Sequence, residues 1–141
     1  MLLRERSRDG YATVTNYIGI IQEHEHSGMQ VHQSPPVFQL NGNSAYYSVT
    51  WCAGVIAHDS IHSKLYFDYK KQHPWSLWVP ARTYGGDDAE HACLEHQLSV
   101  LKDDRRTDER NQLVPPMRDP DEQILGREIQ KSKLVTNIRV E

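Results

Sequence analysis

The longest helical pattern in the chain runs from Ser44 to Lys71. Apolar side chains recur there at steps of three and four residues, which is the spacing of a helix with one buried face, and the stretch contains no proline. Capping and turn-forming residues precede it at 41–44, and His73-Pro74 follows, where proline disfavours further helix. The pattern therefore predicts one long helix, whose buried positions are Tyr47, Trp51, Val55, Ile56, Leu65 and Tyr66.

The segment from Tyr11 to Glu25 carries two conflicting signals. Its apolar residues fit helical spacing, whereas its β-branched and aromatic residues favour a strand. Because the apolar residues come in adjacent pairs, at Tyr17-Ile18 and Ile20-Ile21, rather than alternating, we predict a helix. Residues 1–9 are polar and charged and are expected to be frayed.

Two short strands are expected before the long helix. Residues 29–33 alternate apolar and polar side chains, and Val37–Leu40 is a second strand candidate. Pro35-Pro36 separates them and suits the edge of a sheet, because proline lacks the backbone N–H that a central strand donates. A polar turn is expected at 24–28. Helices and a small sheet in this order predict an α+β fold.

A second helix is predicted from Ala89 to Lys102, capped by Asp87-Asp88. Its core-facing residues by spacing are Ala89, Cys93, Leu94, Leu98, Val100 and Leu101. The connection at 74–88 is expected to be a long loop over the site, packed down by Trp75 and Trp78, with Arg82 and Tyr84 available to face a cleft.

The chain divides into a domain at 1–110 and a C-terminal part at 111–141. The charged run at 103–110 is expected to be a solvated helix end or linker. Prolines at 115, 116 and 120 predict turns, residues 121–128 predict a short helix, and the alternation at 134–140 predicts a last strand or an arm.

Length and composition indicate one soluble domain. The 141 residues suffice for a single core, and the formal net charge of -3, with basic residues scattered among acids, argues against a nucleic-acid partner. No apolar run reaches membrane-spanning length and the start lacks a signal peptide, so we expect a cytoplasmic protein without a membrane partner. Cys52 and Cys93 form no disulfide framework and are expected to be inert core thiols.

Candidate chemistry lies on the long helix. His58 and His62 are four residues apart and so share one face, and two imidazoles at this spacing can hold one divalent ion. Asp59 lies between them. Glu90, in the first turn of the second helix, is either a third metal ligand or an acid that complements the helix dipole. His91 and Glu95 compete for the ligand position.

The motif His58-Asp59-Ser60-Ile61-His62, followed by Glu90 on a later helix, resembles the gluzincin group of zinc metallopeptidases. The chain is also similar to small bacterial proteins with an HDxxH variant of HExxH, and the resemblance covers about residues 28–101. It implies a zincin-like α+β domain, with a small sheet whose edge strand lies over a central metal-binding helix. It further implies a Zn²⁺ ion held by His58, His62 and Glu90, a peptide or protein substrate, and Asp59 at the position of the general base.

Aspartate at this position departs from the family pattern. Its side chain is one methylene shorter than glutamate, so its carboxylate falls on the order of 1 Å short of the usual position, and a misplacement of that size can cost about a hundredfold in rate. The resemblance therefore implies a zinc-dependent hydrolase whose peptidase activity is impaired or altered.

Two other readings remain open from the sequence. Ala57-His58-Asp59 also resembles the HD-type metal phosphohydrolases, in which Asp59 would itself be a ligand together with His26 and with Asp87 or Asp103. The second is a non-catalytic, peptidase-like binding protein. The sequence gives no indication of the oligomeric state.

Overall fold

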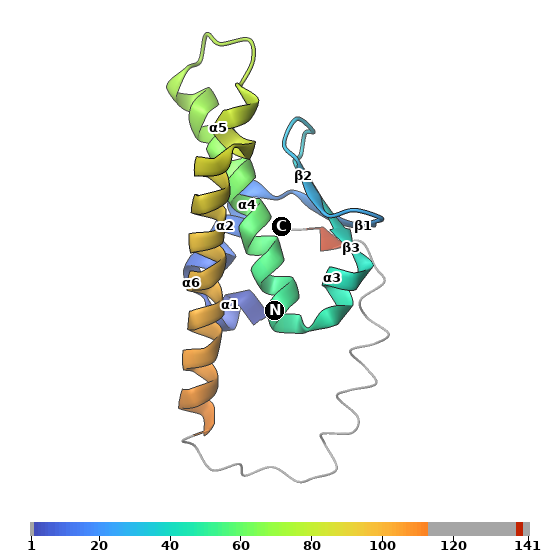
Figure 1. Cartoon of the computed structure of the whole chain (residues 1–141), viewed down its shortest axis with the longest axis vertical. Helices are drawn as coiled ribbons and strands as arrows, with labels where there is room; N and C mark the ends of the chain where they lie inside the picture. Colours follow the sequence, from blue (N-terminus) through green and yellow to red (C-terminus); the bar gives the residue numbers. More distant parts are fainter. Residues whose placement is uncertain (1, 113–137, 140–141) are drawn as a thin grey trace.

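The structure, a computed structural model, describes residues 2–112 and 138–139. The fold is α+β, which confirms the predicted class (Figure 1). Its elements in chain order are α1 (Leu2–Arg6), α2 (Arg8–Tyr17), β1 (Ile20–His24), β2 (Gly28–Gln30), β3 (Val37–Asn41), α3 (Gly42–Tyr47), α4 (Val49–Gln72), α5 (Ala81–Gly85), α6 (Asp87–Gln112) and β4 (Ile138–Arg139).

The two long helices, α4 and α6, pack against each other along much of their length (Figure 1). Several residues of α4 are small and fully buried: Ala57, Ser60 and Ser63. A Cβ atom on Gly54 would lie 3.2 Å from Leu101 Cδ2 of α6, closer than ordinary van der Waals contact. The absence of a side chain at Gly54 therefore lets α4 and α6 approach closely beside Gln97 and Leu101.

The predicted long helix is interrupted at one residue. Ser48 is extended, with φ -162° and ψ 156°, and its Oγ accepts a hydrogen bond of 3.0 Å from Trp51 N, so α3 ends and α4 begins there. This break leaves Tyr47 79% and Trp51 42% exposed, so their predicted burial is wrong. The predicted end at His73 is confirmed.

The sheet corrects two predictions. Its strand order is β2-β3-β1-β4, with β1 and β3 parallel and the other pairs antiparallel. Residues 20–24, expected to be helical, form β1, because Ile20 and Ile21 pair with Val37 and Phe38 once α2 has ended before Gly19.

β3, expected at the sheet edge, lies inside the sheet. Pro35 and Pro36 precede its first residue, so every residue of β3 keeps the backbone N–H that pairing in the sheet requires. The edge strand beside α4 is instead β2, which confirms only part of the predicted 29–33 strand.

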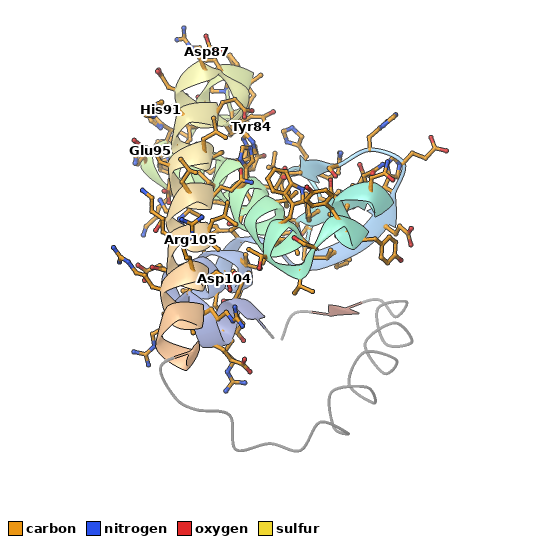
Figure 2. The ribbon with its side chains drawn as sticks, turned by 60° about the horizontal axis from the view of Figure 1, so that its bottom comes forward. Tyr84, Asp87, His91, Glu95, Asp104 and Arg105 are labelled. Atoms are coloured by element: carbon orange, nitrogen blue, oxygen red, sulfur yellow. The ribbon has the colours of Figure 1, made fainter. Side chains whose placement is uncertain are left out.

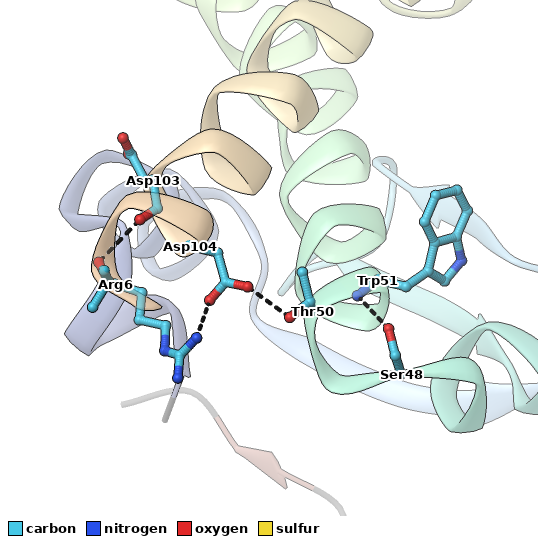
Figure 3. A network of polar contacts seen from close by, with 7 residues as sticks. Arg6, Ser48, Thr50, Trp51, Asp103 and Asp104 are labelled. Carbon is cyan, nitrogen blue, oxygen red and sulfur yellow. Dashed lines mark hydrogen bonds and ion pairs between the residues drawn. The ribbon is translucent and has the colours of Figure 1, made fainter. Parts of the chain in front are cut away.

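The N-terminus is ordered rather than frayed. Leu3 is 3% exposed within the core, and Ser7 caps α2. Arg6 and Thr50 both donate to Asp104, each at 2.7 Å, and Ser7 Oγ donates to Asp103 at 2.9 Å (Figure 3).

The prediction for 103–110 is confirmed in part. The run is the end of α6, as one of the two alternatives had it, and not a linker, but Asp104 is 5% exposed rather than solvated.

The main core lies between α2, the sheet and α4. Its members include Val14, Ile18, Phe38 and Ala57. On α6, Ala89, Cys93 and Val100 are buried as predicted, whereas Leu94 and Leu98 are more than half exposed, contrary to prediction. No helix within the described part of the chain combines the length and apolarity needed to cross a bilayer.

The C-terminal part is described only at Ile138–Arg139. These residues pair with β1 as β4, in agreement with the predicted last strand at 134–140. The predicted turns and short helix at 111–128 lie outside the described residues, apart from the end of α6.

Candidate metal centre

The structure brings His58, His62 and Glu90 together. α4 presents the two imidazoles on the face that packs against α6, with ring centroids 5.2 Å apart. Glu90, in the first turn of α6, lies opposite both rings: His58 Nε2 is 3.4 Å from Oε2, and His62 Nε2 is 3.5 Å from Oε1. The imidazoles are largely shielded, at 18% and 12% exposure, whereas the Glu90 side chain is 51% exposed.

The other ring nitrogen of each histidine is held by an acceptor. His62 Nδ1 lies 2.5 Å from the carbonyl oxygen of Tyr84, and His58 Nδ1 lies 3.2 Å from Gln97 Oε1. A carbonyl oxygen accepts only, so His62 carries its proton on Nδ1, and the amide oxygen of Gln97 favours the same tautomer in His58. In the neutral form of these tautomers, each Nε2 carries a lone pair, and each Nε2 lies within 3.5 Å of an oxygen of the Glu90 carboxylate.

Three acceptors that face one another need a cation between them. Neutral imidazole lone pairs and a carboxylate repel unless a proton or a metal ion intervenes. Burial, followed by the neighbouring charge of His62, lowers the pKa of His58, so protonation is disfavoured there. Two ligands about 2.0–2.1 Å from a tetrahedral zinc lie about 3.3 Å apart, close to the observed nitrogen–oxygen separations. The donor types, two imidazoles and a carboxylate, are ones that zinc accepts, and each nitrogen lies beside its own carboxylate oxygen.

Cys93 lies beneath the imidazoles as another potential donor. Its Sγ is within 4.8 Å of a nitrogen of each histidine, and its side chain is fully buried. Burial first, then the charges of Glu90 and Asp59, raises the pKa of this thiol to about 12. We favour Glu90 as third ligand, because its two carboxylate oxygens lie 3.4 and 3.5 Å from the two nitrogens, whereas the Cys93 thiol must lose a tightly held proton before it can bind.

Asp59 is a buried carboxyl group beside the pair. It is 9% exposed and lines the same cavity as both histidines. Burial raises the pKa of Asp59 to about 6; His62 opposes this shift and Glu90 adds to it. A carboxyl group with a pKa near neutrality can both take up and release a proton under ordinary conditions.

An open cavity of about 410 Å³ gives access to the site. The edge strand β2 and the turn before it form one wall, and α5 with the start of α6 forms another. Its lining residues are Ser27, Gly28, Met29, His58, Asp59, His62, Tyr84, Gly85 and Glu90.

The two alternative candidates for the third ligand, His91 and Glu95, do not line the cavity. His91 and Glu95 are 75% and 70% exposed and pair with each other at 3.6 Å. In Figure 2 they lie on the side of α6 away from Tyr84. Arg82, expected to be available to the cleft, is exposed and does not line the cavity.

The HD-type ligand set is not assembled. His26 and Asp87 are exposed and absent from the cavity lining, and Asp103 binds Ser7 toward the other end of α6. The sheet also conflicts with the all-helical fold that this reading requires.

Sequence reasoning missed the partners that orient the histidines. Gln97 shares a helical face with Glu90 and Cys93, and that spacing was the available signal for it. The Tyr84 carbonyl has no side-chain signature, since any residue supplies one. The contribution of Gly28 and Met29 to the cavity depends on where β2 lies in the sheet.

Comparisons with protein-family models, curated proteins and solved structures find no match to this chain. The gluzincin resemblance and the zincin-like arrangement therefore stay predictions, and the functional argument depends on the geometry of the site.

Proposed function

We propose that this protein is a zinc-dependent hydrolase that cleaves peptide bonds. One observation carries the proposal: the Nε2 atoms of two imidazoles lie 3.4 and 3.5 Å from the oxygens of one carboxylate in an open cavity. His58, His62 and Glu90 would hold the ion and leave a further position for water or substrate. When bound, zinc supplies Lewis acidity, which polarises a carbonyl and lowers the pKa of water.

Asp59 is the proposed proton carrier. In amide hydrolysis, water adds its oxygen to the carbonyl carbon, the C–N bond breaks, and a proton passes from the water to the leaving nitrogen. Asp59 takes and returns that proton, a role that its pKa of about 6 permits near neutral pH. Its short side chain predicts slow turnover compared with a glutamate at the same position.

β2 supports a peptide as the substrate class. Among the described residues it pairs on one side with β3, and its residues Gly28 and Met29 line the cavity. Its other edge offers backbone N–H and C=O groups to an extended peptide, which would lie across the site as an added strand.

The test is turnover of a fluorogenic peptide library by the zinc-loaded protein, with Asp59→Asn as the diagnostic variant. We expect cleavage that a chelator abolishes, and a loss of at least about a hundredfold in Asp59→Asn although its zinc content is unchanged. Leu98→Ala, on the exposed side of α6, is the matched control. Equal turnover in Asp59→Asn and wild type would refute the assigned role of Asp59.

A non-catalytic peptide-binding protein is the second candidate, favoured by the shortness of Asp59. It predicts zinc-dependent peptide binding without cleavage of any library member. Fluorescence anisotropy of labelled peptides, measured with and without chelator, separates the two candidates when run beside the turnover assay.

A further inference from the structure

The loop at 73–80, between α4 and α5, projects at one end of the long axis of the molecule (Figure 1). It presents three large apolar side chains to solvent: Trp75 is 94%, Leu77 98% and Trp78 68% exposed. The expectation that its tryptophans pack the loop down is therefore wrong. So much apolar surface on one short loop suggests a binding surface, which we name the tip and define as Trp75, Leu77 and Trp78.

The tip is held in this exposed arrangement by contacts of its neighbours Ser76 and Val79. Val79 is 8% exposed and packs with Val31 and Tyr66 in a small second core, which anchors the loop. Ser76 Oγ donates to the Trp78 carbonyl at 2.6 Å, and Ser76 N donates to the His73 carbonyl at 3.0 Å. The loop thus buries its valine while the larger tryptophans and leucine stay outside.

Basic residues flank the tip in the sequence. Residues 69–86 contain Lys70, Lys71 and Arg82 and no acidic residue, although the whole chain has a net charge of -3. All three basic residues are exposed. The nearest preceding acid, Asp68, is engaged by Lys64 at 2.5 Å, and the exposed acids Asp87 and Asp88 follow at the start of α6, which packs against α5.

We propose that the tip binds the surface of an anionic phospholipid bilayer. Tryptophan prefers the membrane–water interface, and basic residues beside an inserted apolar segment attract anionic headgroups. A convex tip of three side chains suits insertion between headgroups, whereas a stable protein partner covers about 800 Å² on each side. This proposal departs from the expectation of no membrane partner, which was based on the lack of a membrane-spanning segment; surface binding needs no such segment.

The experiment uses the full chain in a Trp51→Phe background. The chain has three tryptophans, so the tryptophan fluorescence then comes from the tip alone. Vesicles of phosphatidylcholine, with and without phosphatidylserine, are added. We expect a blue shift and quenching by brominated lipid with the anionic vesicles, and binding at least about tenfold weaker to the neutral vesicles.

Variants separate the tip from other exposed apolar residues. Trp75→Ser with Trp78→Ser, in the wild-type background, should weaken vesicle co-sedimentation at least about tenfold, and so should Lys70→Gln with Lys71→Gln on anionic vesicles. Leu94→Ser with Leu98→Ser removes exposed leucines elsewhere and should leave binding unchanged. Thermal unfolding checks that each variant folds. The quenching by brominated lipid is measured on a protein with an intact tip, so that test does not depend on whether the tip variants fold.

Two results would overturn the proposal. One is the absence of quenching and co-sedimentation with anionic vesicles. The other is a wild-type dimer on size-exclusion chromatography that the tip variant converts to monomer, which would assign the tip to a second copy of the chain. Neither outcome depends on zinc, so the proposed hydrolase is tested separately.

Discussion

At the scale of single residues, the site depends on which nitrogen of each imidazole carries a proton. The Tyr84 carbonyl and Gln97 Oε1 accept from the two Nδ1 atoms, which leaves both Nε2 atoms free to bind a cation. The sequence predicted that His58 and His62 share a face. It did not predict these acceptors, because their position depends on how α5 and α6 pack against α4.

Replacement of Gln97 tests this orientation. We expect Gln97→Leu to weaken zinc binding about 10- to 100-fold while the protein stays folded, because His58 loses the partner that fixes its ring. Competition with a chromogenic chelator measures the affinity. Leu98→Ala, one residue further on α6, serves as the control, and an affinity equal to wild type would show that Gln97 does not orient the ligand.

We expect Asp59 to lower the unfolding free energy of the zinc-free protein by an amount that depends on pH. The pKa of Asp59 rises from 3.8 to about 6 on folding, mainly through burial, so the folded state binds the proton more tightly than the unfolded state does. The resulting destabilisation is full above pH 6, declines as the pH falls from about 6 to 4, and vanishes below 3.8.

Asp59→Asn should therefore unfold at higher urea concentration than wild type at pH 8, with a gain of about 1–3 kcal/mol in unfolding free energy. Near pH 4 the two proteins should be closer in stability. Asp88→Asn, at an exposed acid, should show no comparable gain at pH 8. If Asp59→Asn were no more stable than wild type at pH 8, the burial cost assigned to Asp59 would be wrong.

At the scale of elements, sequence patterns identified the helices and strands better than their boundaries. The long apolar repeat indicated a helix from 44 to 71, yet Ser48 divides it, because its hydroxyl caps α4. Residues 20–24 were misassigned because the pairing with β3, a contact distant in sequence, decided between two comparable local preferences. The prediction that β3 lies at the sheet edge was wrong because both prolines come before the strand, where they remove no hydrogen bond between strands.

The Ser48 cap is testable by substitution. Ser48→Ala should lower the unfolding free energy by about 1 kcal/mol, because Trp51 N loses its acceptor at the start of α4. Urea or thermal unfolding measures the change. Ser99→Ala, at an exposed position within α6, should have little effect. Equal effects of the two substitutions would mean that the cap contributes nothing specific to α4.

At the scale of the whole molecule, the site forms because α4 and α6 pack closely and the sheet edge closes one side. Gly54 permits that approach near Gln97 and Leu101. The sequence indicated the separate donors, His58, His62 and Glu90, from their helical positions. The cavity walls from β2 and α5 were not predictable, since they depend on sheet order and on a short helix that the loop pattern did not reveal.

Zinc binding measured by isothermal titration calorimetry tests the central claim most directly. Wild type should bind one ion per chain, and His58→Ala and Glu90→Ala should each weaken binding at least about a hundredfold, whereas Cys93→Ser should keep an affinity close to wild type. Absence of zinc binding in wild type, or unchanged affinity in Glu90→Ala with loss in Cys93→Ser, would contradict the assignment of His58, His62 and Glu90 as the metal ligands.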